Sequence, residues 1–160
     1  MLCKVSAAGA APAPRRDRSD MTHDLRATMQ RFLEFINSGD EAIGREVIHP
    51  DAAFMTPISP EPLRGLDGYL QILGVMRGAI PDVQWTLEQL VVEGDHVAAR
   101  FELRGTHGGE SVGVPATGRP IAVGASAFYR FADGRIIDEV GQPDLLALLG
   151  QIGALPPALR

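Results

Sequence analysis

The pattern of apolar and polar positions changes part-way along the chain, from helical spacing to alternation. In the first half, apolar residues recur three and four positions apart, which predicts one-faced helices. The first two predicted helices begin after residues that cap helix N-termini, Thr22 or Asp24 and then Asp40. Pro81 stops the third. The predicted helices cover about residues 24–36, 41–47 and 66–80.

Alternation between apolar and polar residues dominates after Pro81 and predicts β-strands. Gly-containing turns at 93–96 and 132–134 separate strands expected at about 83–92, 97–106, 119–131 and 135–140, and a short extended piece lies at 52–56. Helices followed by strands indicate an α+β fold. We expect a curved antiparallel sheet of about four to six strands, with three N-terminal helices on its concave face and a short C-terminal helix after residue 144.

Composition narrows the domain organisation and the possible partners. The 160 residues fit one domain at 21–155, after an Ala-, Pro- and Arg-rich leader at 1–20 predicted to be disordered and before a tail at 156–160. A net charge of -5 disfavours nucleic acid and anionic membranes as partners. The single cysteine, Cys3, gives no disulfide framework, and the four histidines show no metal-ligand spacing. No secretory signal is recognisable, which indicates a cytoplasmic protein.

An ordered set of short motifs resembles the SnoaL-like polyketide cyclases, also called ester cyclases. The set runs from about residue 25 to residue 153, and upstream it contains Gly39-Asp40, His49-Pro50-Asp51-Ala52 and Pro81-Asp82. Downstream it contains Gly105-Thr106-His107, Gly113 to Arg119, Tyr129 to Ile136, Asp144-Leu145-Leu146 and Gly150 to Gly153.

The resemblance implies a cone-shaped fold of the nuclear-transport-factor superfamily with a pocket between sheet and helices. It also implies catalysis without metal or cofactor, in which a polyketide ring closes by an intramolecular aldol step. By order and spacing, Asp144 matches the aspartate that acts as general acid or base in the family. The alternative interpretation of Asp144 is a plain helix cap. The family often has Glu-His-Trp where this chain has Asp138-Glu139-Val140.

Two further charged residues are candidates for the catalytic site. Alternation places Asp138 on the face of the last strand that carries Ile136, so Asp138 faces the pocket if Ile136 faces the core, as in the family. A carboxyl group in an apolar pocket has a raised pKa, which suits acid/base work. Arg130 could pair with Asp144 or stabilise an enolate oxygen, and its alternative is an exposed strand residue.

The predicted substrate-binding residues come from several elements. Arg100 and Glu102 share one strand face and resemble part of a limonene epoxide hydrolase site, but that site is incomplete here and a solvated, cross-strand pair of charges is the favoured interpretation. The remaining candidates are His107, which we expect at the pocket rim, and the wall residues Phe54, Tyr69, Trp85 and Phe128.

These observations favour a cofactor-free cyclase, or a related lyase or isomerase, that acts on a hydrophobic polyketide-like carbonyl compound. Two alternatives stay open. One is a binding protein of the same fold without chemistry, which Val140 in place of the family's tryptophan favours. The other is an epoxide hydrolase. In this superfamily a second copy usually covers the free sheet face, so we expect a homodimer.

Overall fold

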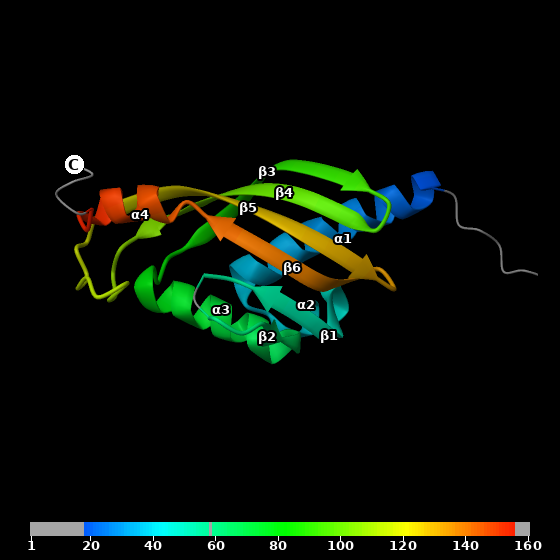
Figure 1. The fold of residues 1–160 in the computed structure, drawn as a ribbon, viewed down its shortest axis with the longest axis horizontal. Coiled ribbons are helices and arrows are strands. Elements are labelled where there is room, and N and C mark those ends of the chain that lie inside the picture. Colours follow the sequence, from blue (N-terminus) through cyan, green and yellow to red (C-terminus); the bar gives the residue numbers. More distant parts are fainter. Residues whose placement is uncertain (1–17, 58, 156–160) are drawn as a thin grey trace, which may run out of the picture.

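One sheet of six strands, with helices on one side, makes up the folded part of the chain (Figure 1). The structure, a computed structural model, describes residues 18–57 and 59–155. The expected α+β fold is confirmed. In chain order the elements are α1 (Arg18–Ser38), α2 (Glu41–Val47), β1 (Ile48–Met55), β2 (Leu63–Arg64), α3 (Gly65–Ala79), β3 (Gln84–Glu93), β4 (His96–Thr106), β5 (Pro120–Ala132), β6 (Arg135–Pro143) and α4 (Leu145–Ile152).

The strands follow the order β2-β1-β6-β5-β4-β3. Strands β3 to β6 form the predicted antiparallel meander, in which tight turns join β3 to β4 and β5 to β6, and the longer segment 107–119 joins β4 to β5. β1 instead pairs in parallel with β6. The sheet is therefore mixed, and the β1–β6 seam joins the N-terminal half of the chain to its C-terminal end.

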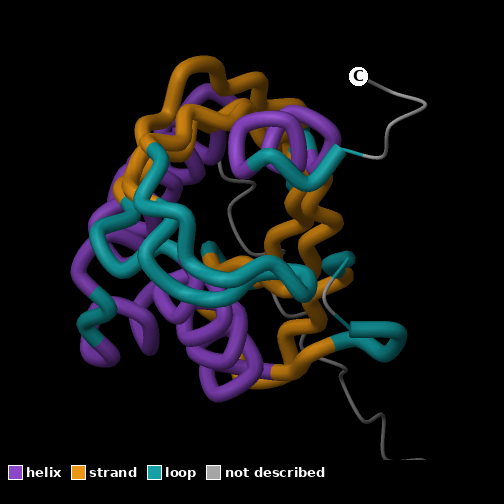
Figure 2. The backbone as a smooth tube through the Cα atoms, turned by 90° about the vertical axis from the view of Figure 1, so that its left-hand side faces the viewer, coloured by secondary structure: helices purple, strands orange, loops and turns teal. Residues whose placement is uncertain are grey.

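The helices cover the inner face of the curved sheet. α1 packs against β3, and α3 packs against β1 and β2. Figure 2, a view along the long axis, shows the strands bending around the helices. An aromatic cluster fills the layer between them, with Tyr69 as its centre: its ring lies 4.8 Å from Phe54, 5.3 Å from Phe32 and 5.6 Å from Phe35, centroid to centroid.

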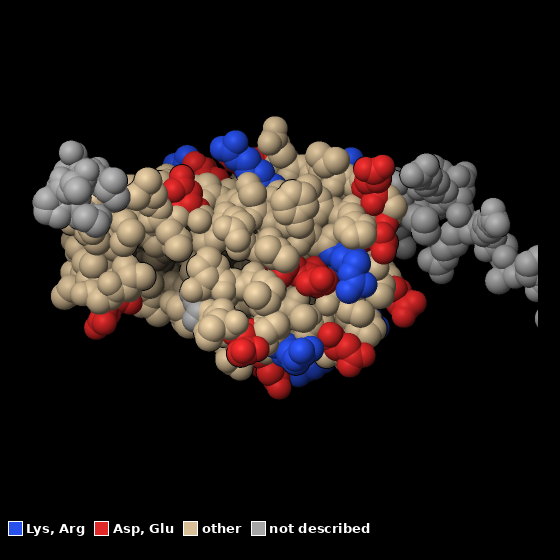
Figure 3. All heavy atoms as spheres, in the orientation of Figure 1, with Lys and Arg blue, Asp and Glu red and all other residues tan. Residues whose placement is uncertain are grey.

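The outer face of the sheet has no helix packed along its middle. Figure 3 shows a broad, mainly uncharged area over β5 and β6. One group of oppositely charged side chains lies within it, and other Lys, Arg, Asp and Glu side chains lie mainly around its edges. Phe128 is 68% exposed there and Val140 is 42% exposed. The inner face of this sheet therefore packs against a core, whereas the outer face presents apolar side chains to solvent.

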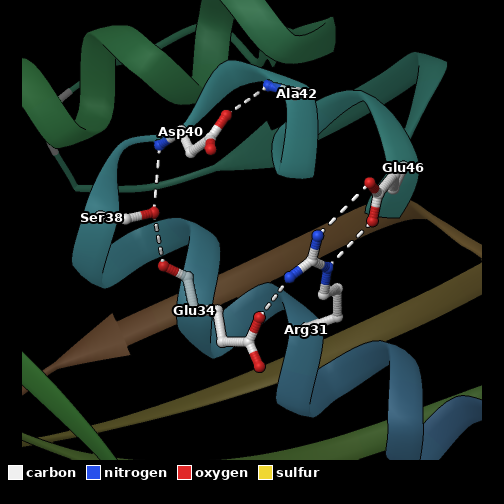
Figure 4. Close-up of polar contacts among 6 residues, drawn as sticks. All are labelled: Arg31, Glu34, Ser38, Asp40, Ala42 and Glu46. Carbon is white, nitrogen blue, oxygen red and sulfur yellow. Dashed lines mark hydrogen bonds and ion pairs between the residues drawn. The ribbon is translucent and has the colours of Figure 1, made fainter.

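A short polar network fixes the junction of α1 and α2 (Figure 4). The Asp40 carboxylate accepts a hydrogen bond of 2.8 Å from the Ala42 amide, so Asp40 is the N-cap that the sequence predicts. The Ser38 hydroxyl accepts a bond from the Asp40 amide. Arg31 of α1 pairs with Glu46 of α2, Nε to Oε2, at 2.9 Å. These contacts set the angle at which α2 leads into β1.

A β-bulge near the start of β6 reverses the alternation on which the predicted strand faces depend. Arg130 of β5 pairs with Asp138, but the next residue, Phe131, pairs with Ile136, which leaves Ile137 as an extra residue in β6. Ile136 before the bulge and Glu139 after it therefore both point inward, and both are buried. Asp138 faces outward.

The N-terminal boundary differs from the prediction. Residues 18–20, which we expected at the end of a disordered leader, form the first turn of α1. The rest of the predicted leader and the tail at 156–160 lie outside the described residues. Within the described part, no helix is long and apolar enough to span a bilayer.

Candidate active site

A cavity of about 120 Å³ opens between α3 and the inner face of the sheet. Because one water needs about 10–15 Å³ of such space, the cavity has room for roughly ten waters or one small organic molecule. Residues from α1, α3 and the strands β3 to β6, together with the segment that follows β1, line it. They are Ile36, Thr56, Pro57, Tyr69, Ile72, Leu73, Met76, Trp85, Phe101, Leu103, Ala125, Ser126, Ala127, Tyr129, Glu139, Gly141, Gln142 and Pro143.

The cavity has an apolar wall and a more polar wall. Ile72, Leu73 and Met76 of α3 contribute aliphatic surface on the helix side. On the sheet side, the lining residues include Glu139 and Tyr129, which carry a carboxyl group and a hydroxyl group. An apolar pocket with a few fixed polar groups is the usual form of a site for a small organic ligand.

Trp85 is held in the cavity wall by a side chain from α1. The Asn37 amide accepts a hydrogen bond of 2.8 Å from the Trp85 backbone N–H and donates one of 2.9 Å to the Trp85 carbonyl. This paired bond completes the ladder where β3 begins, at the edge of the sheet. The backbone of Trp85 is therefore bonded to the end of α1 as well as to the sheet.

Glu139 is the only carboxylate among the residues that line the cavity. It is 7% exposed, and its Oε2 atom has no hydrogen-bond partner among the described residues. Burial raises the pKa of Glu139 to about 8, because an apolar surrounding disfavours the charged form. The neighbouring Tyr129 hydroxyl acts in the opposite direction by hydrogen bonding to the carboxylate, and the charge of Asp138 raises the pKa further. At neutral pH Glu139 is therefore mostly a neutral acid.

Two tyrosines beside Glu139 remain protonated over the whole physiological range. Burial, and next the charge of Glu139, raise the pKa of Tyr69 and that of Tyr129 well above the ordinary value. The group of Glu139, Tyr69 and Tyr129 can therefore donate protons or hydrogen bonds to an oxygen atom of a bound molecule.

Sequence reasoning missed Glu139, because strict alternation placed it on the face opposite Ile136. The bulge at Ile137 reverses that assignment, so the cavity-facing orientation expected for Asp138 is corrected to Glu139. One signal was available in the sequence. Two adjacent isoleucines, Ile136 and Ile137, interrupt the alternation, as a bulge in a half-buried strand does.

Asp144 lies where β6 ends and α4 begins. It caps α4, and its Oδ1 atom accepts a hydrogen bond of 2.9 Å from the Ala147 amide. The side chain is exposed, and it follows directly on Gln142 and Pro143, which line the cavity. The helix cap is thus present, and Asp144 follows the cavity lining in the chain without being part of it.

Arg130 and Asp138 are register partners on the outer face of the sheet, where they form an ion pair of 3.9 Å between Nη2 and Oδ2. Their side chains are 45% and 41% exposed. Both residues lie on the face of the sheet that points away from the cavity, so neither is placed to touch a molecule bound in it.

Arg100 and Glu102 also face outward, as expected for a solvated pair of charges. Arg100 pairs with Glu88 at 2.9 Å, and Glu102 pairs with Arg104 at 2.7 Å. Because Glu102 points away from the cavity, it is not placed to form a limonene-epoxide-hydrolase-type site with an acidic residue inside.

The other predicted binding residues divide between cavity, core and surface. Tyr69 and Trp85 line the cavity, as expected. Phe54 is fully buried and packs edge-on against Tyr69, whereas Phe128 is exposed on the outer face. His107 is fully buried, and its Nδ1 atom lies 2.9 Å from the hydroxyl of Thr117. The predicted rim position of His107 is therefore corrected to the interior of the β4–β5 connection.

In the described part of the chain, no group of three or more His, Cys, Asp and Glu side chains could hold a metal ion. The cavity offers one carboxyl group and several hydroxyls instead. Its chemistry is that of proton donation and hydrogen bonding.

Comparison with known proteins shows the family to which the chain belongs. The family model of the SnoaL-like polyketide cyclases matches residues 26–152, which is nearly all of the described part. The chain belongs to the SnoaL-like polyketide cyclase family. The motif set from which the sequence predicted this family thus extends over the same part of the chain.

The relatives of this SnoaL-like chain include two methyl ester cyclases. It is 30% identical over 128 residues to the aklanonic acid methyl ester cyclase DnrD of Streptomyces peucetius, covering 78% of this chain and 88% of DnrD. It is 32% identical over 126 residues to the nogalonic acid methyl ester cyclase of Streptomyces nogalater, covering 76% of this chain and 92% of that one.

Solved structures share its fold. The structure of TsrD from Streptomyces laurentii superposes with a TM-score of 0.74 at 31% identity, covering 88% of this chain and all of TsrD. IdmH from Streptomyces antibioticus gives a TM-score of 0.71 at 34% identity, covering 81% of this chain and 98% of IdmH.

Proposed function

We propose that this protein is a cofactor-free cyclase that closes a ring of a hydrophobic polyketide ester by an intramolecular aldol reaction. Family membership supports this reaction class, and the two ester cyclases named above suggest a methyl ester of a polycyclic acid as the substrate. The apolar wall of the cavity suits such a carbon skeleton.

The observation that carries the proposal is the buried Glu139 in an otherwise apolar cavity. An aldol reaction turns a carbonyl oxygen into an alkoxide, and a neutral acid beside that oxygen stabilises the charge as it develops. A carboxyl group with a pKa of about 8 is protonated at neutral pH and also transfers its proton readily near that pH.

Asp144 is the proposed base, and Glu139 the proposed acid. The Asp144 carboxylate takes a proton from the carbon next to the ester carbonyl, and the resulting enolate carbon forms a bond to the carbon of a second carbonyl group. The oxygen of that second carbonyl takes the proton of Glu139 as its C=O double bond becomes a single bond. No group leaves, so the product is an isomer of the substrate, and one proton returns through solvent from Asp144 to Glu139.

The test is turnover of aklanonic acid methyl ester by the wild type and by three single variants, Glu139→Gln, Asp144→Asn and Asp138→Asn. Loss of a general acid or base lowers kcat by roughly 10²–10⁴-fold. We expect that loss for Glu139→Gln and for Asp144→Asn. Asp138→Asn is the matched control, because Asp138 is the chain neighbour of Glu139 on the opposite face of the sheet, and it should keep kcat within about twofold.

Wild-type kcat in a folded Glu139→Gln variant would contradict the role of Glu139, and the same result for Asp144→Asn would remove the base. A wild-type protein that binds the ester without converting it would support the binding-protein alternative and end the cyclase proposal.

We further propose a homodimer formed through the outer face of the sheet. Five apolar residues follow one another across five strands as register partners, in the order Met55, Val140, Phe128, Ala98 and Val91, of which only Ala98 is small. Met55, Val91, Phe128 and Val140 are between 40% and 68% exposed. A contiguous exposed apolar stripe of this kind is typical of a surface covered by another protein chain.

A further inference from the structure

Two buried polar atoms without a partner lie in the same cavity. Of the described residues, three have a buried side-chain N or O atom with no hydrogen bond: Thr56, His107 and Glu139. Thr56 and Glu139 both line the cavity, whereas His107 does not. Because most buried polar atoms in proteins are hydrogen-bonded, two unpaired atoms in one cavity indicate that a bound molecule supplies their partners.

The two residues are neighbours on the β1–β6 seam. Phe54 and Glu139 are register partners, and both are buried on the inner face. Thr56 is two positions beyond Phe54, so alternation returns its side chain to that face. Two residues along one strand and one strand across correspond to roughly 8 Å between the Cα atoms of Thr56 and Glu139. Both side chains extend into the space between, which brings their oxygens within reach of one edge of a small molecule.

We infer that Thr56 is a specificity-determining residue, whose hydroxyl binds a second oxygen on the same edge of the substrate as the carbonyl that meets Glu139. The inference rests on the proposed function and defines the substrate class more narrowly. The ligand is a flat, mainly apolar ring system with two oxygens side by side along one edge, such as a keto group next to a phenolic hydroxyl.

The rest of the cavity supports this orientation. Phe101 and Leu103 on the sheet and Met76 on α3 offer only apolar contact, so an oxygen turned toward them would lose its hydrogen bonds to water without replacement. An edge with two oxygens satisfies both unpaired atoms when it faces the seam. A ligand with a single oxygen on that edge leaves Thr56 unpaired.

The chain contains a built-in reporter for this test, because its single tryptophan, Trp85, lines the cavity. The experiment measures quenching of Trp85 fluorescence by two probes of one ring system. 1-Hydroxyanthraquinone has two oxygens on one edge, and 9,10-anthraquinone has one oxygen on each edge. Each probe is titrated into the wild type and into the variants Thr56→Val, Thr56→Ser and Thr86→Val. Thr86 is an exposed residue next to Trp85 and serves as the matched control.

We expect the wild type to bind 1-hydroxyanthraquinone about 3–10-fold more tightly than 9,10-anthraquinone, which is the range of a single neutral hydrogen bond. Thr56→Val should bring the ratio of the two Kd values close to one without weakening the binding of 9,10-anthraquinone. Thr56→Ser should restore the preference, and Thr86→Val should leave it unchanged. Valine has nearly the shape of threonine and removes an unpaired buried hydroxyl, so the variant should unfold at the wild-type temperature or above it.

A wild type without preference would overturn the inference, as would a Thr56→Val variant that keeps the preference or weakens both probes equally. The titration does not require turnover, so its result is separate from that of the cyclase assay. If the preference depends on Thr56 while no ester is converted, the binding inference stands and the cyclase proposal fails. If esters are converted while the preference is independent of Thr56, the cyclase proposal stands and this inference fails.

Discussion

Asp138 and Glu139 are adjacent acids on one strand, yet they lie in opposite surroundings. Asp138 is on the outer face, 41% exposed, and pairs with Arg130. Glu139 is on the inner face, 7% exposed, and its pKa is raised to about 8. The outer carboxyl group has solvent and a cation as neighbours, whereas the inner one has aromatic rings and a tyrosine hydroxyl. One peptide unit thus separates a surface charge from a group suited to acid catalysis.

The difference between the two acids shows that strand register decides which side chains face the cavity. The bulge at Ile137 determines which of the two acids meets the cavity, since one extra residue reverses the faces of all that follow. A catalytic candidate in a strand therefore has to be argued from the register and not from its neighbours in the chain.

The largest expected difference between Asp138 and Glu139 is in how each makes the stability of the fold depend on pH. The pKa of Glu139 is about 8 in the folded protein, against an ordinary value of 4.5. Between these values the folded protein holds more protons than the unfolded chain, so its stability falls as pH rises from about 4.5 and levels off above about 8. At ~1.4 kcal/mol for each pKa unit, the full loss is roughly 3–5 kcal/mol.

The Glu139→Gln variant should not show this loss of stability at high pH, because glutamine does not ionise. Urea unfolding at pH 5 and pH 9 should show the variant gaining that amount of stability relative to wild type at the higher pH. Asp138→Asn is the control: an exposed ion pair contributes about 1 kcal/mol or less, so this variant should follow the wild type at both pH values. If the free energy of unfolding changed with pH in the same way for Glu139→Gln and the wild type, Glu139 would ionise as an exposed residue does.

Local features of the fold were predictable because they depend on neighbouring residues. Asp40 caps α2 as expected, Pro81 follows the end of α3, and the turn at 132–134 joins β5 to β6. Alternation in β4 correctly separated the charged pair of Arg100 and Glu102 from the buried face.

Features that depend on pairing between distant segments were not predictable in the same way. The parallel contact of β1 with β6 joins residues more than eighty positions apart, and no local signal specifies it. The bulge in β6 changed the candidate acid from Asp138 to Glu139. The position of Thr56 in the cavity follows from the same β1–β6 seam, so the sequence did not indicate it.

A second prediction concerns the outer face of the sheet. Its apolar side chains are exposed in the single chain and buried in the proposed dimer. Phe128 lies in the middle of the apolar stripe, so Phe128→Asp would place a charge at the centre of the proposed dimer. We expect the Kd of the dimer to rise by about tenfold to a hundredfold, as for a central aromatic contact. Sedimentation equilibrium at micromolar concentration measures it. A wild-type protein that is monomeric under these conditions would contradict the dimer, and Arg26→Ala, an exposed position on α1 on the other side of the sheet, is the control.

The most direct measurement of the central claim is the titration of the Glu139 carboxyl group itself. In protein labelled with ¹³C at the glutamate side-chain carboxyl, the Glu139 signal is assigned by its absence from Glu139→Gln and followed by NMR from pH 4 to pH 10. A titration midpoint near the value of about 8 would confirm a protonated acid inside an apolar cavity at neutral pH. A midpoint near the ordinary value of 4.5 would contradict it, and the proposed catalytic role of Glu139 would be lost.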